Sequence, residues 1–198
     1  MVEAELAKLK ETPSQTAGPF VHIGTLPALA GLKSRQEPQN ILAGDDTLGR
    51  RIRIEGRIFD GAGALVKDAI VEIWQADANG QFGSNAFPGW GRAATDFATG
   101  RFAFETVKPG ATPFHDGRKQ APHVSFAIFA RGINIHLQTR MYFPDEAAAN
   151  ATDPVLQLVG TPELAATLIG RKETGAEMPV YRFDIHLQGE RETVFFDV

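Results

Sequence analysis

The chain has 198 residues, 43% of them hydrophobic, with a formal net charge of −4 and no cysteine. This length fits one large domain or a smaller domain with arms, and the missing thiols exclude a disulfide framework, a zinc ribbon, an iron–sulfur site and a cysteine nucleophile. The weak acidity argues against a nucleic-acid-binding protein, and no apolar stretch approaches the 18 residues of a membrane span, so neither nucleic acid nor membrane is an expected partner.

Residues 1–46 read as an N-terminal arm and residues 47–198 as the folded domain. A short helix is expected over Val2–Lys10, followed by extended or turn structure over Thr12–Phe20, which contains two prolines and a glycine. The N-terminus has no apolar signal region, so we expect a cytoplasmic protein. Because the arm has little core of its own, we expect it to form an interface with this domain or with another chain.

From Thr47 onward apolar residues alternate with polar ones, which is typical of half-buried strands. Turn signals such as Asp60-Gly61 separate these segments. The pattern predicts an all-β, antiparallel β-sandwich. The expected strands are Ile52–Ile58, Ala69–Gln75, Phe102–Thr106, Val124–Ala130, Ile133–Met141 and Tyr181–Leu187, with Thr193–Asp197 as the candidate for a seventh.

Two short helices are expected between the fifth and sixth strands. Asp153-Pro154 and Thr161-Pro162 each pair an N-cap residue with proline at the first helical position. The segments Asn79–Gly91 and Gly110–Pro122 read as long loops, and loops on a rigid sandwich are where a site is expected.

The common catalytic and cofactor-binding motifs are incomplete or absent in this sequence. Gly61-Ala62-Gly63 lacks the third glycine and the helix of a dinucleotide site, and there is no Gly-x-Ser-x-Gly. The five histidines show no H-x-H, H-x-x-H or H-x-x-x-H spacing. An autonomous metal site from His136, Asp184 and His186 stays open as an alternative, although a solvated sheet face explains the same residues.

Arg131 stands at an expected strand end and is followed by Gly132. One interpretation is a rim arginine paired with a nearby acid. The other is a fixed cation that faces a cleft, where its planar donors suit a carboxylate.

Several long segments, in order along the chain, carry a resemblance. They are Thr12–Phe20 (TPSQTAGPF), Val71–Gly80 (VEIWQADANG), Thr106–Gly110 (TVKPG), Phe129–His136 (FARGINIH) and Tyr181–Ile185 (YRFDI). From about Thr12 to the C-terminus the chain resembles the intradiol ring-cleaving dioxygenases, and most closely the α-type subunits of members that cleave protocatechuate.

The resemblance implies an iron site that this chain lacks. The family's catalytic chains bind Fe(3+) through two tyrosines and two histidines. Here the loop after Trp74 holds no tyrosine, and the other matching positions carry Thr112, His123 and Ser125. Neutral hydroxyls replace phenolate poorly. The resemblance therefore implies no metal and no catalytic residue in this chain, and Fe(3+) held by a homologous β subunit.

The same resemblance assigns this chain a share of its partner's pocket. The matching positions contributed to substrate binding are Thr16, Gly18, Pro19, Phe20 and Arg131, with Phe20 where the family usually has tyrosine. The implied reaction is O2-dependent opening of protocatechuate to 3-carboxy-cis,cis-muconate, by a hetero-oligomer of αβ units in which this chain alone is inactive. A stand-alone sandwich without enzymatic activity is the other alternative.

Overall fold

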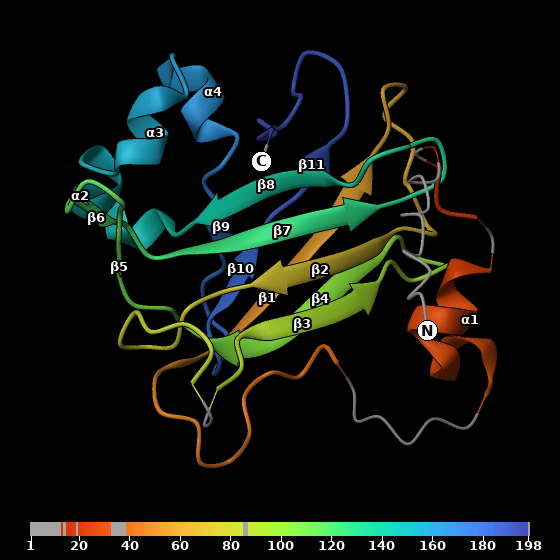
Figure 1. Ribbon diagram of the computed structural model, residues 1–198, viewed down its shortest axis with the longest axis horizontal. Helices are drawn as coiled ribbons and strands as arrows, with labels where there is room; N and C mark the ends of the chain where they lie inside the picture. The colour runs from red at the N-terminus through yellow and green to blue at the C-terminus, as the bar shows by residue number, and fades with distance from the viewer. Residues whose placement is uncertain (1–12, 14, 19, 33–38, 85–86, 198) are drawn as a thin grey trace, which may run out of the picture.

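The computed structural model describes residues 13, 15–18, 20–32, 39–84 and 87–197, so the expected helix over Val2–Lys10 lies outside them. Two β-sheets pack on one another, with short helices at the two ends of the molecule (Figure 1). The strands are β1 (Arg51–Phe59), β2 (Ile70–Trp74), β3 (Trp90–Ala94), β4 (Arg101–Val107), β5 (Thr112–Pro113), β6 (Lys119–Gln120), β7 (His123–Phe129), β8 (Leu137–Tyr142), β9 (Arg171–Lys172), β10 (Val180–Arg182) and β11 (Ile185–His186). The helical segments are α1 (Val21–Thr25), η1 (Pro27–Ala30), η2 (Pro144–Glu146), α2 (Ala147–Ala151), α3 (Pro154–Leu158) and α4 (Pro162–Ala166).

The second sheet, β3-β2-β7-β8, is antiparallel throughout. In the first sheet β4 pairs antiparallel with β1, and β10 and β11 pair with β1 in parallel. β9 continues that sheet beyond β10, and β5 and β6 form a separate hairpin. The predicted antiparallel β-sandwich is thus confirmed, with two parallel pairings that the sequence did not predict.

The core lies between the two sheets. In β1 the buried residues Ile52, Ile54 and Ile58 alternate with half-buried charged ones, as the period of two predicts. Phe102 of β4 reaches across to Phe126 of β7, with ring centroids 6.1 Å apart. Aromatic rings meeting edge-on or offset at this spacing bind the two sheets into one hydrophobic core.

The predicted sixth strand is divided into β10 and β11, and Gly56 of β1 explains why. Phe183 donates from its backbone N to the carbonyl O of Glu55 at 2.8 Å, and its own carbonyl O would lie 1.9 Å from a Cβ at Gly56. Only glycine permits this approach. The Asp184 carboxylate then accepts from the backbone N of Arg57 at 3.1 Å, which interrupts the ladder.

Three further segments differ from the sequence expectation. β8 begins at Leu137 rather than Ile133, because a turn follows β7. β3 begins at the end of the expected Asn79–Gly91 loop, where the sequence Trp-Gly-Arg-Ala-Ala shows no clear alternation of apolar and polar residues. Thr193–Asp197 is no strand, although Phe196 bridges to Gln138 and Thr193 donates from its backbone N to the carbonyl O of His186 at 2.9 Å.

The expected helices α3 and α4 are confirmed with their caps. Asp153 accepts from the backbone N of Val155 and Leu156, and Thr161 accepts from the backbone N of Leu164. In Figure 1, α2, α3 and α4 lie at one end of the sandwich and α1 lies at the other, beside the end of β3. Over the described ranges, no helix is long and apolar enough to cross a membrane.

The last part of the predicted arm belongs to the core. Leu42 and Ala43 are buried among the sheet residues, and Leu42 donates from its backbone N to the carbonyl O of Glu105 at 2.8 Å. The arm therefore joins the sandwich at this point, before the expected boundary at residue 46.

Candidate functional site

Arg131 lies on a tight turn that ends β7. The backbone N of Ile133 donates to the carbonyl O of Ala130 at 3.2 Å, and Gly132 has a φ of +86°. A positive φ at the third position is the requirement of a type II turn, which glycine meets without strain. The turn projects the Arg131 side chain outward, and 69% of that side chain is exposed.

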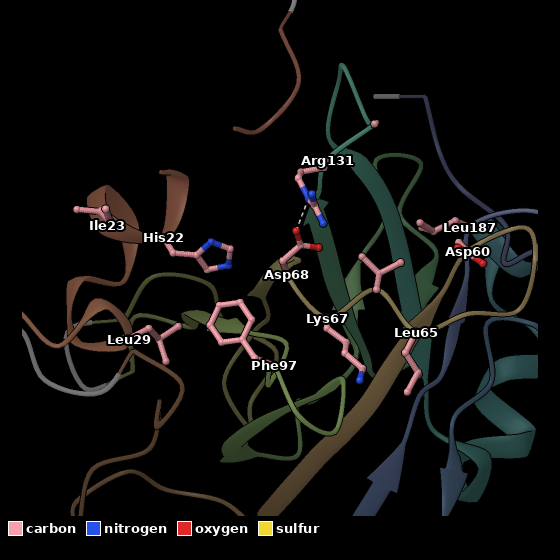
Figure 2. Close-up of a pocket in the computed structure, with 12 residues that line it drawn as sticks. His22, Ile23, Leu29, Asp60, Leu65, Lys67, Asp68, Phe97, Arg131 and Leu187 are labelled. Carbon is pink, nitrogen blue, oxygen red and sulfur yellow. Dashed lines mark ion pairs between the residues drawn. The ribbon is translucent and has the colours of Figure 1, made fainter. Parts of the chain in front are cut away.

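Asp68 forms an ion pair with Arg131, through its Oδ2 atom and the arginine Nε. Figure 2 shows the two side chains facing one another at the mouth of a cavity. Asp68 precedes β2, and its side chain is 26% exposed. The pairing of Arg131 with an acid is confirmed, and the arginine also lines a cavity, whereas its binding of a carboxylate there stays a prediction.

Thr16 ties the arm to the same turn. Its hydroxyl donates to the carbonyl O of Ala130 at 3.4 Å and accepts from the backbone N of Gly132 at 2.9 Å. One hydroxyl can do both, and here it brackets the two residues that flank Arg131. The structure thus brings together Thr16 and Arg131, which the sequence places 115 positions apart.

The other predicted arm residues follow Thr16 at the surface. Gly18 accepts from the backbone N of Val21 at 3.1 Å and begins the turn into α1. Phe20 is 76% exposed, which is unusual for a large apolar ring. Pro19 lies outside the described residues.

A cavity of about 1030 Å³ lies between α1 and the Arg131 turn. In Figure 2, His22 and Leu29 line one side of the cavity and Asp68 and Arg131 the other, with Phe97 between them. The lining combines apolar and charged side chains. Its residues are His22, Ile23, Leu29, Asp60, Leu65, Val66, Lys67, Asp68, Phe97, Arg131, Gly132 and Leu187.

The three positions that match family iron ligands lie elsewhere, on β5 and β7. Thr112 is buried, and its hydroxyl accepts from Nε2 of Gln120 at 3.3 Å. His123 is also buried, and its Nδ1 lies 2.8 Å from the carbonyl O of Ala121. Burial, reinforced by the positive charge of Arg140, lowers the pKa of His123 to about 4, so the imidazole is neutral and donates from Nδ1. Ser125 is half-buried.

Neither tyrosine supplies a phenolate. The Tyr142 hydroxyl donates to Oδ1 of Asp153 at 3.1 Å, and the Tyr181 hydroxyl donates to Oδ2 of Asp145 at 2.9 Å. Burial, with the neighbouring carboxylate, raises the pKa of both phenols above the usual value. One imidazole and two neutral hydroxyls do not fit the donor set that Fe(3+) prefers.

The alternative metal site is not assembled. His136 stacks on Phe129 with ring centroids 5.4 Å apart, whereas His186 stacks on Phe59 at 4.8 Å. The Asp184 carboxylate accepts a hydrogen bond from the backbone N of Arg57 in β1. Across the part of the chain that the structure describes, no three His, Asp or Glu side chains are grouped closely enough to hold a metal ion.

Sequence reasoning missed Asp68, His22 and Phe97. Asp68 carried a signal, because it lies just before a predicted strand as Arg131 lies just after another. That signal becomes readable only when the pairing of β2 with β7 and its register are known. His22 and Phe97 belong to segments without periodicity, and nothing in the sequence joins them to the site.

Comparison with known proteins decides the family. A family model described as Dioxygenase matches residues 27–189. The protocatechuate 3,4-dioxygenase alpha chain of Pseudomonas putida is 51% identical over 195 residues, covering 96% of this chain and 97% of that one. The chain belongs to the intradiol dioxygenase family. Its two-sheet sandwich is accordingly the fold of that family's members.

Two other similar proteins extend this comparison, one by sequence and one by structure. The protocatechuate 3,4-dioxygenase beta chain of Burkholderia cepacia is 37% identical over 173 residues, covering 78% of this chain and 72% of that one. The solved dioxygenase domain of a carbohydrate-binding fusion protein from Streptomyces sp. SirexAA-E has a TM-score of 0.61 at 24% identity, and the match covers 93% of this chain and all of that one. The first shows that alpha and beta chains are homologous, and the second supports the fold alone.

Proposed function

We propose that this chain is the α subunit of a heteromeric protocatechuate 3,4-dioxygenase. In this proposal it binds no iron and pairs with a homologous β subunit, which holds Fe(3+). The names of the relatives support the type of enzyme, and the donor set at Thr112, His123 and Ser125 supports the absence of iron from this chain. Cytoplasmic location stays a prediction from the sequence.

The role of this chain is to complete the substrate pocket of the β subunit. The observation that carries this role is the joint at Thr16, which fixes the arm to the turn that exposes Arg131. A planar guanidinium on a fixed turn suits the carboxylate of protocatechuate. It would orient the catechol ring before reaction, and orientation of a bound reactant lowers the barrier of the step that follows.

Phe20 serves the same pocket through its apolar ring. A phenylalanine contributes no hydroxyl to hydrogen-bond the ligand, so its part is to pack against the partner or the substrate and exclude water. The 76% exposed ring is consistent with burial on assembly. The ring-opening chemistry, in which both oxygen atoms of O2 enter the product 3-carboxy-cis,cis-muconate, belongs to the iron of the β subunit.

Reconstitution tests this proposal. The chain and its β homologue are purified separately, and O2 uptake with protocatechuate is measured while this chain is titrated into a fixed amount of the β chain. We expect this chain alone to be inactive, and full activity to be reached at one chain per β chain. Activity of this chain alone would contradict the proposal, as would activity of the β chain that this chain does not change.

A further inference from the structure

The register of the second sheet places Asp68 opposite Arg131. Ile70 of β2 is the partner of Phe129 of β7 in an antiparallel ladder. In such a ladder a step toward the start of one strand matches a step past the end of the other. Two positions beyond this pair, past the ends of both strands, stand Asp68 and Arg131, and their ion pair sets the acid against the arginine.

The contact engages only one edge of the guanidinium. The Nε atom of Arg131 meets Oδ2 of Asp68, and among the described residues Arg131 has no other ion-pair partner. A guanidinium carries five N–H donors in a fixed fork, four of them on the two terminal nitrogens. The contact at Nε holds the plane of the guanidinium. The edge formed by Nη1 and Nη2, the terminal edge, stays available for a second carboxylate.

We propose that Asp68 is a positioning residue for Arg131, which holds the guanidinium so that its terminal edge receives the carboxylate of the substrate. The inference rests on the proposed function, because it specifies how this chain presents its cation to the β subunit's pocket. A long arginine side chain loses rotamer freedom when it binds a ligand, and a side chain restrained beforehand loses less. Thr16 and Gly132 restrain the backbone of the turn, and Asp68 restrains the side chain.

Asp68 also has an effect of opposite sign, since its negative charge repels the substrate's carboxylate. Substitutions separate the two effects. Asp68→Ala removes both the charge and the acceptor for Nε, whereas Asp68→Asn keeps an acceptor oxygen and removes only the charge. If positioning dominates, the alanine variant binds protocatechuate more weakly than the asparagine variant does.

The experiment measures equilibrium binding of protocatechuate to the αβ holoenzyme without O2. Binding of catechol, which lacks the carboxylate, is measured alongside. We expect Asp68→Ala to weaken protocatechuate binding about two- to tenfold, the range for restraining one flexible side chain. Asp68→Asn should weaken it less, and catechol should bind alike in all forms. Equal weakening of both ligands would reveal a merely structural disturbance and overturn the inference.

A double-variant comparison separates this inference from the function on which it rests. In the Arg131→Ala background, Asp68→Ala should no longer weaken protocatechuate binding, because the positioned group is gone and only the repulsion between the two carboxylates is relieved. Unchanged protocatechuate binding in Arg131→Ala alone would overturn the proposed role of Arg131. A loss in Arg131→Ala, with unchanged or tighter binding in Asp68→Ala, would overturn only the positioning role and identify Asp68 as a competing anion.

Asp116→Ala is the matched control. Asp116 forms an exposed ion pair with Arg118, with Oδ2 and Nη2 2.7 Å apart, on the turn between β5 and β6. The substitution removes an aspartate from a surface Asp–Arg pair without touching the Arg131 turn. We expect protocatechuate binding to stay unchanged, and a loss equal to that of Asp68→Ala would contradict the specific role of Asp68.

Discussion

The Arg131 turn and the surroundings of His123 differ in how their polar groups are satisfied. At the turn, the guanidinium is exposed and engaged at one edge only. Around His123, the imidazole hydrogen-bonds to a carbonyl, and the neighbouring Tyr142 hydroxyl is held by the fully buried Asp153. The first region leaves hydrogen-bond donors at the surface, and the second is buried core. The proposed role of this chain therefore uses the surface at Arg131 and not the region around His123.

The largest expected effect tests whether the buried region around His123 stabilises the fold. Asp153 accepts from the backbone N of Ala121 at 2.7 Å, from the Tyr142 hydroxyl, and from the backbone N of Val155 and Leu156 at 2.9 Å. Asp153→Ala removes an N-cap and leaves buried donors without acceptors, so the free energy of unfolding should fall by about 3–5 kcal/mol. Urea denaturation of the purified chain measures this.

The control for Asp153 is Thr161→Ala, which removes the N-cap of the neighbouring helix α4 at an exposed position. A cap alone contributes about 1 kcal/mol. If Asp153→Ala costs no more than Thr161→Ala, the region around His123 is looser than described and could still admit a ligand.

Low pH should reduce the free energy of unfolding through the protonation of His123. Its pKa of about 4 in the folded chain is below the ordinary value of 6.5. The unfolded chain therefore binds a proton between these two pH values and the folded chain does not. Stability is complete above about pH 6.5 and declines as the pH falls toward 4, by about 3 kcal/mol at 1.36 kcal/mol per pKa unit.

Urea denaturation between pH 7 and pH 4 measures this loss in the natural chain and in His123→Asn. Asparagine keeps a donor for the Ala121 carbonyl and does not titrate in this range. We expect the variant to show a flatter pH dependence. Identical slopes would mean that His123 is protonated in the folded chain.

Substitution of Arg131 tests whether the Arg131 turn binds the carboxylate of the substrate. In the αβ holoenzyme Arg131→Ala should lower kcat/KM for protocatechuate about 10- to 150-fold, because one charge-assisted contact contributes about 1.5–3 kcal/mol. The iron content should not change. Arg118→Ala removes another exposed arginine as the control, and equal kinetics in the two variants would place the substrate's carboxylate elsewhere.

Thr16 gives the smallest effect. Thr16→Val keeps the shape of the side chain and loses the hydroxyl that contacts Ala130 and Gly132. A hydrogen bond contributes about 0.5–1.5 kcal/mol, so kcat/KM should fall about two- to tenfold. Thr16→Ser keeps the hydroxyl and should restore most of the activity. If the serine variant is as slow as the valine variant, the methyl group and not the hydroxyl joins the arm to the turn.

The sequence predicted those parts of the fold that depend on neighbours along the chain. The alternation of β1 and the caps at Asp153 and Thr161 are local patterns, and the structure confirms them. The break between β10 and β11 depends on Gly56, a residue more than a hundred positions away. No local pattern carries such information.

The residues of the candidate site also divide into those that the sequence predicted and those that it missed. Motif resemblance pointed to both Thr16 and Arg131, and in the structure Thr16 hydrogen-bonds to the two residues that flank Arg131. Asp68 was missed because its partner is set by the register of two strands, which periodicity leaves open by any even number of residues. His22 and Phe97 form part of the cavity wall only because a helix and a turn pack against each other. The local sequence pattern of either segment does not predict this packing.

Iron content of the separated subunits is the measurement that tests the central claim most directly. The αβ complex is purified with its metal, the chains are separated without chelators, and iron is counted on each. We predict about one iron per β chain and none on this chain, with full O2 uptake when the two are recombined. Iron on this chain after separation would contradict the account, because it would require a ligand set that Thr112, His123 and Ser125 do not provide.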